Sequence, residues 1–190
     1  MTVEKISEKE MIPERFSLVV WQWYLKWRGL LLGKGAKVYP FVLIDRPRNV
    51  SFGKNTIVYP FVYVMSQNPN GWLQVGENCE INSFSTLLCG NGVQIGNYVL
   101  LSPGVKIISS TNYYKPNWLI ASNPHVGGKV IIEDNVHIGT NAVILPNVRI
   151  GSGSIIGAGS IVTESVPNDT IAYGVPCRTH KKREEKILRS

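Results

Sequence analysis

Branched aliphatic residues recur every six positions along most of this chain. The period is unbroken from residue 132 to residue 162, and before that it appears in triplets that are shifted slightly against one another. The positions are Val38, Ile44, Val50, Phe52, Val58, Val64, Val75, Ile81, Leu87, Ile95, Leu101, Ile107, Ile132, Ile138, Ile144, Ile150, Ile156 and Val162. Neither an α-helix nor an indefinitely extended strand repeats every six residues. The period is typical of short strands and turns, three of each per coil, in a parallel β-helix.

A second series tests this interpretation, because the residue four positions after each aliphatic should also point inward and should be small. These residues are Val42, Thr56, Val62, Cys79, Ser85, Val99, Val105, Val136, Ala142, Val148, Ser154 and Ser160. Arg48 and Asn91 break the series, and both lie where the triplets shift. A β-sandwich of irregular short strands would not produce the two series together. The pattern therefore predicts an all-β solenoid of about six coils, with glycines at corners that need a positive φ.

The chain divides into three parts. Residues 1–35 contain a loosely docked lead-in and a helix at 16–32. The coils occupy residues 36–166, and a long loop at 108–131 interrupts them. Such an insertion protrudes from a solenoid and usually has a function. Residues 167–190 form an extension that ends in a basic helical tail. The expected architecture is a β-helix with an N-terminal helix, one protruding loop and a C-terminal helical tail.

The helix at 16–32 is strongly apolar along one face. Residues at helical spacing along this face are Phe16, Val19, Val20, Trp23, Trp27, Leu30 and Leu31. The segment is too short and too charged to span a bilayer. It favours a cap over the unpaired edge of the first coil. The alternative is an interfacial helix that holds the protein at a membrane surface.

Charge and cysteine content narrow the function classes. The formal net charge is +7, and basic residues gather in the tail, so the tail is a solvated segment, a phosphate contact or a contact with an anionic membrane. We expect no nucleic-acid partner, because no nucleic-acid motif is present. Only 17% of residues are charged, which suggests that other subunits cover part of the surface. Three cysteines without a Cys-x-x-Cys pair argue against a disulfide framework and a zinc knuckle. With no signal sequence visible, we expect a cytoplasmic protein.

The end of the repeat carries a resemblance. The segment Ile156-Gly-Ala-Gly-Ser-Ile-Val-Thr163, followed by Ala172-Tyr-Gly-Val-Pro-Cys-Arg178, resembles the C-terminal signature of the hexapeptide-repeat acyltransferases. The chain is most similar to the branch of galactoside and maltose O-acetyltransferases and of surface-polysaccharide acetyltransferases. The resemblance covers roughly residues 75–181. It implies a left-handed β-helix, acetyl-CoA as the donor substrate, and a homotrimer with its active sites between subunits.

The resemblance also implies roles for individual residues. Asn82 matches the active-site asparagine of the family, and its side chain should face outward. The residues that match CoA-binding positions are Gly139, Thr140, Ala158, Gly159, Thr163, Arg178 and Lys181. Small residues let the pantetheine arm lie against the coil, and the cations suit the phosphates. Glu164 stands where the family often has a lysine, which should weaken the grip on CoA slightly.

The residue at the position of the family's catalytic base differs in this chain. The family's histidine at the start of the long loop is replaced here by Asn112, which can orient a substrate but cannot accept a proton at neutral pH. His125 in the loop and His137 at an outward corner are candidate substitutes, and each is equally compatible with a surface or packing role. The third histidine, His180, lies in the tail. The three do not have the spacing of a γ-type carbonic anhydrase zinc site, so we expect no metal.

Three functions are compatible with these residues. The first is acetyl transfer from acetyl-CoA to a sugar hydroxyl, in surface-polysaccharide or other saccharide modification. The second is N-acylation of a nucleotide- or lipid-linked amino sugar, where a base matters less because an amine is more nucleophilic. The third is a CoA-binding scaffold that has lost catalysis. The long loop contains no cysteine, so nothing suggests a covalent acyl-enzyme.

Overall fold

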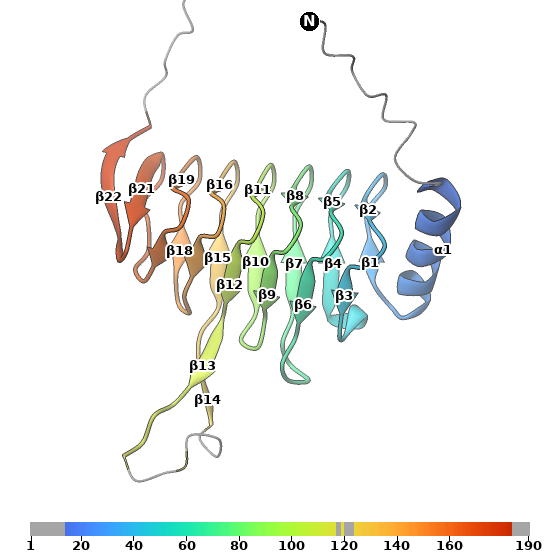
Figure 1. Ribbon diagram of the computed structural model, residues 1–190, viewed down its shortest axis with the longest axis horizontal. Helices are drawn as coiled ribbons and strands as arrows, with labels where there is room; N and C mark the ends of the chain where they lie inside the picture. Colours follow the sequence, from blue (N-terminus) through green and yellow to red (C-terminus); the bar gives the residue numbers. More distant parts are fainter. Residues whose placement is uncertain (1–13, 117–118, 120–123, 184–190) are drawn as a thin grey trace, which may run out of the picture.

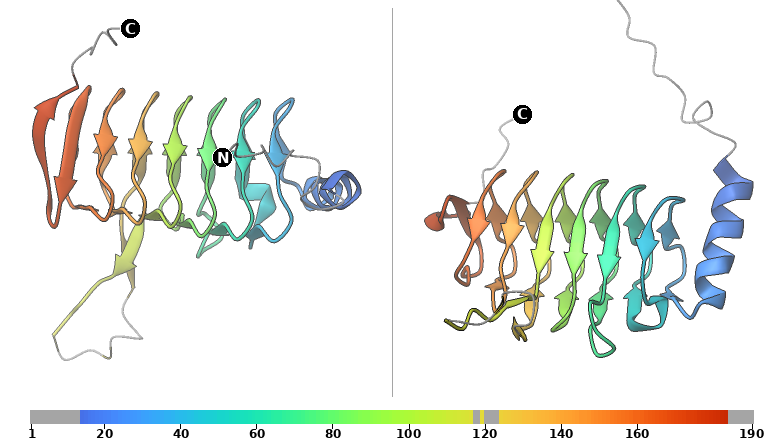
Figure 2. Two further views of the ribbon diagram at one scale, coloured as in Figure 1. Left: turned by 45° about the horizontal axis from the view of Figure 1, so that its top comes forward. Right: turned by 60° about the horizontal axis from the view of Figure 1, so that its bottom comes forward.

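The chain winds into a parallel β-solenoid whose coils stack along one axis (Figure 1, Figure 2). A computed structural model describes residues 14–116, 119 and 124–183. Each coil contributes one short strand to each of three sheets, and strands of successive coils pair in parallel. The solenoid expected from the six-residue period is confirmed. Its left-handed sense stays a prediction from the resemblance.

The strands of the three sheets have the following bounds. The first sheet contains β1 (Leu31–Leu32), β4 (Val50–Phe52), β7 (Leu73–Val75), β10 (Val93–Ile95), β15 (Val130–Ile132) and β18 (Arg149–Ile150). The second contains β2 (Lys37–Val38), β5 (Ile57–Val58), β8 (Glu80–Ile81), β11 (Leu100–Leu101), β16 (His137–Ile138), β19 (Ile155–Ile156), β21 (Thr170–Gly174) and β22 (Cys177–Lys182). The third contains β3 (Leu43–Ile44), β6 (Tyr63–Met65), β9 (Thr86–Leu88), β12 (Lys106–Ile108), β17 (Val143–Ile144) and β20 (Ile161–Val162).

The core runs along the axis and consists of the two series seen in the sequence. Every member of the aliphatic series is buried except Ile44, which is half-buried and packs against the core. All members of the second series are buried, including the polar Thr56, Ser85, Ser154 and Ser160. The buried hydroxyls are satisfied locally; for example, Ser154 Oγ donates to the Pro167 carbonyl at 2.7 Å. Both predicted inward positions of the repeat are therefore confirmed.

The corners differ from the expectation that glycine supplies their positive φ. Several corners place other residues there, among them Asn55, Asn141 and Phe61, with φ of 57°, 57° and 64°. The glycines that follow the inward aliphatic residues are needed for a different reason, which is the close approach of neighbouring coils. A Cβ on Gly139 would lie 2.6 Å from the backbone nitrogen of Ala158 in the next coil, so a side chain cannot fit between the coils. Asparagine tolerates the left-handed conformation better than most residues.

The N-terminal helix α1 (Glu14–Trp27) is shorter than the predicted helix at 16–32. It ends because Gly29 turns the chain at a φ of 98°, after which residues 31–32 pair with β4 as the first strand of the solenoid. Residues 1–13, which include most of the predicted lead-in, lie outside the described residues.

Most of the apolar face described from the sequence does not pack on the first coil. Leu25 is buried and Trp21 packs against the core, whereas Val19, Trp23 and Trp27 are exposed by 64%, 68% and 71%. The helix is apolar on more than one face, so the hydrophobic pattern alone could not identify the side that meets the first coil. Figure 1 shows α1 lying against that end of the solenoid, as expected of a cap.

Two further segments depart from simple coils. The long loop carries a separate antiparallel hairpin of β13 (Ser110–Asn112) and β14 (His125–Gly127), which projects from the solenoid (Figure 1). At the other end, β21 continues the second sheet beside β19, and β22 folds back against β21. The helical tail was therefore wrong for residues 177–182, because pairing with the last sheet edge satisfies their backbone groups. Residues 184–190 lie outside the described residues.

We predict that Leu87→Ala lowers the free energy of unfolding by about 2–5 kcal/mol, because it leaves a cavity inside a coil. Thr86→Ala is the matched control, since Thr86 is the half-buried, outward-facing neighbour in β9. Urea unfolding followed by circular dichroism measures both. Equal losses from the two variants would contradict the assigned core.

Candidate active site

One row of corner residues collects several of the residues singled out by sequence. The row lies where the chain leaves the second sheet toward the third. Asn82, Ser102, Gly139 and Gly157 follow β8, β11, β16 and β19 directly, and these strands are paired in register. The four residues therefore occupy equivalent places in successive coils. We call this set the corner row.

Asn82 is held firmly in the corner row. Its backbone nitrogen and its Nδ2 both donate to the carbonyl of Leu101 in the next coil, at 3.1 Å and 2.9 Å. The side chain is half-buried. An amide nitrogen carries two hydrogens, so the second remains available to a bound oxygen while the first fixes the orientation. This geometry suits a preorganised donor.

His137 lies next to the corner row. It is half-buried on β16, and its Nε2 lies 3.0 Å from Ser102 Oγ. Which atom donates depends on the tautomer of the imidazole. The sequence pattern indicated His137 as a candidate, whereas Ser102 was not among the predicted residues. The signal was present, because Ser102 follows the inward Leu101 just as Asn82 follows the inward Ile81.

An aromatic ladder approaches the corner row from the N-terminal end of the solenoid. Phe41, Phe61 and Phe84 occupy equivalent corner positions, and their rings stack with centroids 5.6 Å and 5.5 Å apart. All three are exposed, and the ladder ends two residues after Asn82. The next coil has Gly104 at the equivalent place, so the stack of rings ends at Phe84. These three residues were not among those predicted from the sequence.

The small residues predicted for CoA binding lie farther along the same corner. Thr140, Ala158 and Gly159 are exposed, and Gly139 is buried within the coil stack. Gly159 has a φ of 67°, and nothing lies within 4 Å of the place where its Cβ would be. A linear ligand could therefore run close to the backbone here without meeting a side chain.

The predicted phosphate contacts lie at the C-terminal end. Thr163, Arg178 and Lys181 are all exposed, and Lys181 lies on β22. Arg178 Nη1 lies 3.5 Å from Glu164 Oε1 and donates to the Cys177 carbonyl at 2.9 Å. Glu164 therefore partly neutralises the cation expected to meet a phosphate.

The remaining candidates, Asn112 and His125, lie apart from the corner row. They are direct cross-strand partners in the hairpin of β13 and β14. His125 is exposed and Asn112 is half-buried. Figure 1 shows this hairpin projecting away from the solenoid, whereas Asn82 and His137 belong to the stacked coils. Within the chain, the structure therefore separates the predicted site residues into two groups.

The cysteines do not provide a nucleophile. Cys79, Cys89 and Cys177 are buried, and burial raises the pKa of each thiol above its ordinary value. They therefore stay protonated at neutral pH, and a thiol attacks far more slowly than a thiolate. Within the described part of the chain, no group of three or more His, Cys, Asp and Glu side chains is arranged to hold a metal ion.

Comparison with known proteins identifies the repeat. Residues 129–164 match the family described as bacterial transferase hexapeptide (six repeats). This segment of the chain is therefore similar to the hexapeptide repeats of bacterial transferases. The matched segment contains His137, Gly139, Ala158 and Gly159, so the family resemblance extends to the candidate site.

Two curated relatives are galactoside O-acetyltransferases. The protein of Lactococcus lactis subsp. lactis (strain IL1403) is 35% identical over 97 residues, which are 51% of this chain and 46% of the relative. The protein of Escherichia coli (strain K12) is 37% identical over 125 residues, which are 60% of this chain and 56% of the relative. This chain thus spans about half the length of these relatives.

A solved structure matches over a larger share of the chain. AntD, an N-acyltransferase from Bacillus cereus, was crystallised with dTDP and 3-hydroxybutyryl-CoA. It has a TM-score of 0.77 and 28% sequence identity, and the match covers 88% of this chain and 90% of AntD. A variant of AntD was crystallised with dTDP-4-amino-4,6-dideoxyglucose and coenzyme A.

We predict that Ala158→Trp abolishes CoA binding, because the indole would fill the exposed strip beside Gly159. Isothermal titration calorimetry measures CoA affinity, and circular dichroism checks that the coils stay folded. Lys54→Trp is the control, since Lys54 is exposed at a different corner. Unchanged CoA affinity in Ala158→Trp would reject the assigned strip.

We predict that Glu164→Gln strengthens CoA binding by about twofold to fivefold, because it releases Arg178 from an exposed ion pair of small energy. The gain should shrink with added salt, since screening weakens exposed charge interactions. Glu77→Gln, at an exposed position in another coil, is the charge-matched control. Calorimetry at two salt concentrations measures both variants, and equal gains would contradict a local role for Glu164.

Proposed function

We propose that this protein transfers an acyl group from acyl-CoA to a sugar acceptor. The observation that carries the proposal is the contact of His137 with Ser102 beside Asn82, on a corner that continues into the exposed strip of Ala158 and Gly159. This arrangement offers a base, an oxyanion donor and a path for CoA along one corner of the solenoid. The galactoside O-acetyltransferase and AntD relatives support the same reaction class.

The reaction requires no covalent enzyme intermediate. The acceptor nitrogen or oxygen attacks the thioester carbonyl carbon, and the new C–N or C–O bond gives a tetrahedral oxyanion. This intermediate collapses by re-forming the carbonyl as the C–S bond breaks and the CoA thiolate leaves. His137 accepts the acceptor proton, directly or through the Ser102 hydroxyl, and returns it to the departing CoA sulfur. The free amide hydrogen of Asn82 stabilises the oxyanion. Holding both substrates at one corner supplies much of the rate.

An amino sugar is the acceptor that we favour. Asn112 cannot act as a base in the hairpin, and a neutral amine needs less help than a hydroxyl. The likeness to AntD, an N-acyltransferase, covers most of the chain. The exposed rings that end at Phe84 offer a flat surface for a base or a sugar.

A sugar hydroxyl is the second candidate, because the curated relatives are O-acetyltransferases and the His137–Ser102 pair can supply the missing base. A role in surface-glycan or lipid-linked saccharide assembly stays a prediction for either acceptor. We also propose a homotrimer, which would allow the Asn112–His125 hairpin of one subunit to approach the corner row of another.

We predict that His137→Ala lowers kcat by about 10²–10⁴-fold, the range for removing a general base, with little effect on CoA affinity. Ser102→Ala should lower kcat less and shift the pH profile, because it changes the partner of His137. His125→Ala is the comparison variant, since exposed His125 on the hairpin is the alternative candidate for the base. Acetyl-CoA consumption against paired sugars and amino sugars measures each variant.

The outcomes separate the alternatives. A collapse in His125→Ala, with His137→Ala unaffected, would move the base to the hairpin. Turnover on amines that survives both substitutions would mean that no protein histidine is needed. CoA binding without turnover on any acceptor would favour a scaffold protein over an enzyme.

A further inference from the structure

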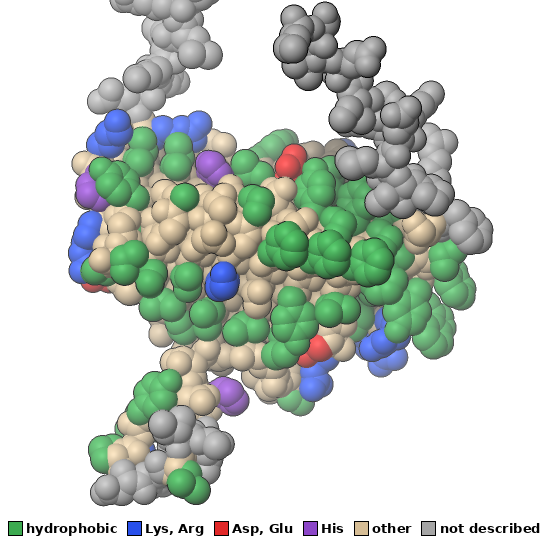
Figure 3. All heavy atoms as spheres, viewed as in Figure 1, with side chains coloured by type: hydrophobic (Ala, Val, Ile, Leu, Met, Phe, Trp, Pro, Cys, Tyr) green, Lys and Arg blue, Asp and Glu red, His purple; other side chains and the backbone are tan. Residues whose placement is uncertain are grey.

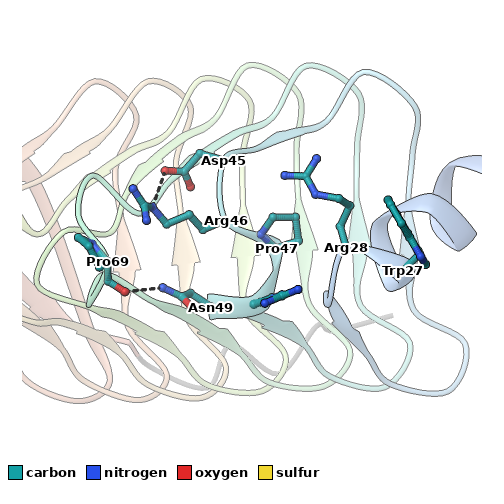
Figure 4. Close-up of a pocket in the computed structure, with 8 residues that line it drawn as sticks. Trp27, Arg28, Asp45, Arg46, Pro47, Asn49 and Pro69 are labelled. Atoms are coloured by element: carbon teal, nitrogen blue, oxygen red, sulfur yellow. Dashed lines mark hydrogen bonds and ion pairs between the residues drawn. The ribbon is translucent and has the colours of Figure 1, made fainter.

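A basic cavity lies at the opposite end of the solenoid from the predicted CoA phosphate contacts. Its volume is about 550 Å³, and its lining consists of Trp27, Arg28, Asp45, Arg46, Pro47, Arg48, Asn49 and Pro69. These residues come from the end of α1 and the residue after it, from residues 45–49, which include the 3-10 helix η1 (Pro47–Asn49), and from a turn of the next coil (Figure 4). Three arginines and one aspartate give the lining an excess of positive charge.

The local fold holds the arginine side chains around this cavity. Arg28 Nη1 donates to Tyr24 Oη at 2.7 Å, and the guanidinium lies 5.7 Å from the Tyr24 ring centroid. Gly29 has a φ of 98° and no side chain, so the aliphatic part of Arg48 lies against its backbone. Neither contact neutralises a charge, and both guanidinium groups keep donors for an anion.

Hydrogen bonds also fix Asn49 and Asp45 in the lining of the cavity. Asn49 Nδ2 donates to the carbonyls of Pro69 and Gly71 at 3.0 Å and 2.8 Å, which ties η1 to the next coil. Asp45 Oδ1 accepts from the Ser66 backbone nitrogen at 2.9 Å, and its Oδ2 lies 3.7 Å from Arg46 Nε. Asp45 therefore offsets part of the charge of one arginine and leaves the others for a ligand.

An exposed apolar face borders the cavity. Val19, Val20, Trp23 and Trp27 lie on the side of α1 that does not pack on the solenoid, and Trp27 also lines the cavity. Leu31 at the start of the first coil is 65% exposed. Figure 3 shows hydrophobic side chains gathered over this end of the molecule, with Lys and Arg side chains beside them. Within the described residues, no helix is long and apolar enough to cross a membrane.

We infer that this end of the protein binds the surface of an anionic bilayer, with a lipid phosphate in the arginine cavity and the Trp23 and Trp27 face of α1 in the headgroup region. Tryptophan prefers the boundary between apolar chains and polar headgroups, and arginines form strong hydrogen bonds with phosphate. A soluble phosphate would explain the cavity but not the adjoining apolar face. A second protein copy would explain the apolar face but not the positive charge.

The test is cosedimentation of the full chain with lipid vesicles. Wild type should pellet with vesicles that mix phosphatidylcholine and phosphatidylglycerol, and should stay in solution with phosphatidylcholine alone. Binding should fall with added salt. Arg46→Gln with Arg48→Gln should weaken binding about tenfold or more. Lys34→Gln with Lys54→Gln is the matched control, because these exposed lysines lie at another corner of the same two coils. The two pairs of substitutions remove the same amount of positive charge.

The apolar face has its own variant. Trp23→Ser with Trp27→Ser should weaken vesicle binding as strongly as the arginine pair, whereas Phe41→Ser with Phe61→Ser, which removes exposed rings elsewhere, should not. Circular dichroism confirms folding of each variant. Equal losses from the arginine and lysine pairs, or equal binding to both vesicle types, would overturn the inference.

Two further outcomes would also overturn it. If glycerol 3-phosphate quenches tryptophan fluorescence in wild type but not in the arginine variant, and no vesicle binds, then the cavity takes a soluble phosphate. If light scattering shows that the tryptophan variant has a smaller assembly mass than wild type, then the apolar face joins copies of this chain. None of these measurements depends on acyl transfer.

Discussion

The stacking of coils at the spacing of paired β-strands is the constraint on which the other features depend. Neighbouring strands in a sheet lie about 4.8 Å apart, so each coil must follow the same path as the coil before it. The backbone nitrogen of His137 donates to the carbonyl of Ser154 in the following coil. In the same way, the backbone nitrogen of Leu100 donates to the carbonyl of Val136, one coil farther along. Inward residues are repeated because every coil closes around the same axis. Glycines such as Gly139 are required where two coils approach too closely for a side chain.

Because of the same constraint, outward residues that are regularly spaced in the sequence form one continuous surface. Outward residues at equivalent places in successive coils lie side by side, which brings Asn82 next to Ser102 and Ser102 next to His137. A fixed backbone holds these groups without a mobile loop, and the amide of Asn82 is locked by the carbonyl of Leu101. The small residues at the same corner continue this surface as a strip along which a linear donor could lie. The proposed chemistry therefore follows from register rather than from a closed pocket.

The two ends of the solenoid meet the problem of an unpaired edge in different ways. At the C-terminal end, β22 folds back against β21 and places Arg178 and Lys181 on an exposed strand. At the N-terminal end, α1 covers the first coil with Leu25 and Trp21, which leaves its other apolar face outside. The cap therefore creates the surface that we assign to a bilayer. The C-terminal end would then bind the phosphates of the donor, and the N-terminal end would contact the membrane.

The sequence by itself determined the solenoid, the inward positions and the corner at which Asn82 and Ala158 lie, because a six-residue period reports directly on a coil that repeats in space. It did not determine which face of α1 is buried, since that helix is apolar on more than one side and only the first coil selects among them. It also could not show that residues 177–182 form a strand, because their pairing depends on the free edge of β21. The separation of His125 from His137, and the contact of His137 with Ser102, were likewise decided by tertiary structure: the hairpin leaves the solenoid, whereas coil stacking joins residues 35 positions apart.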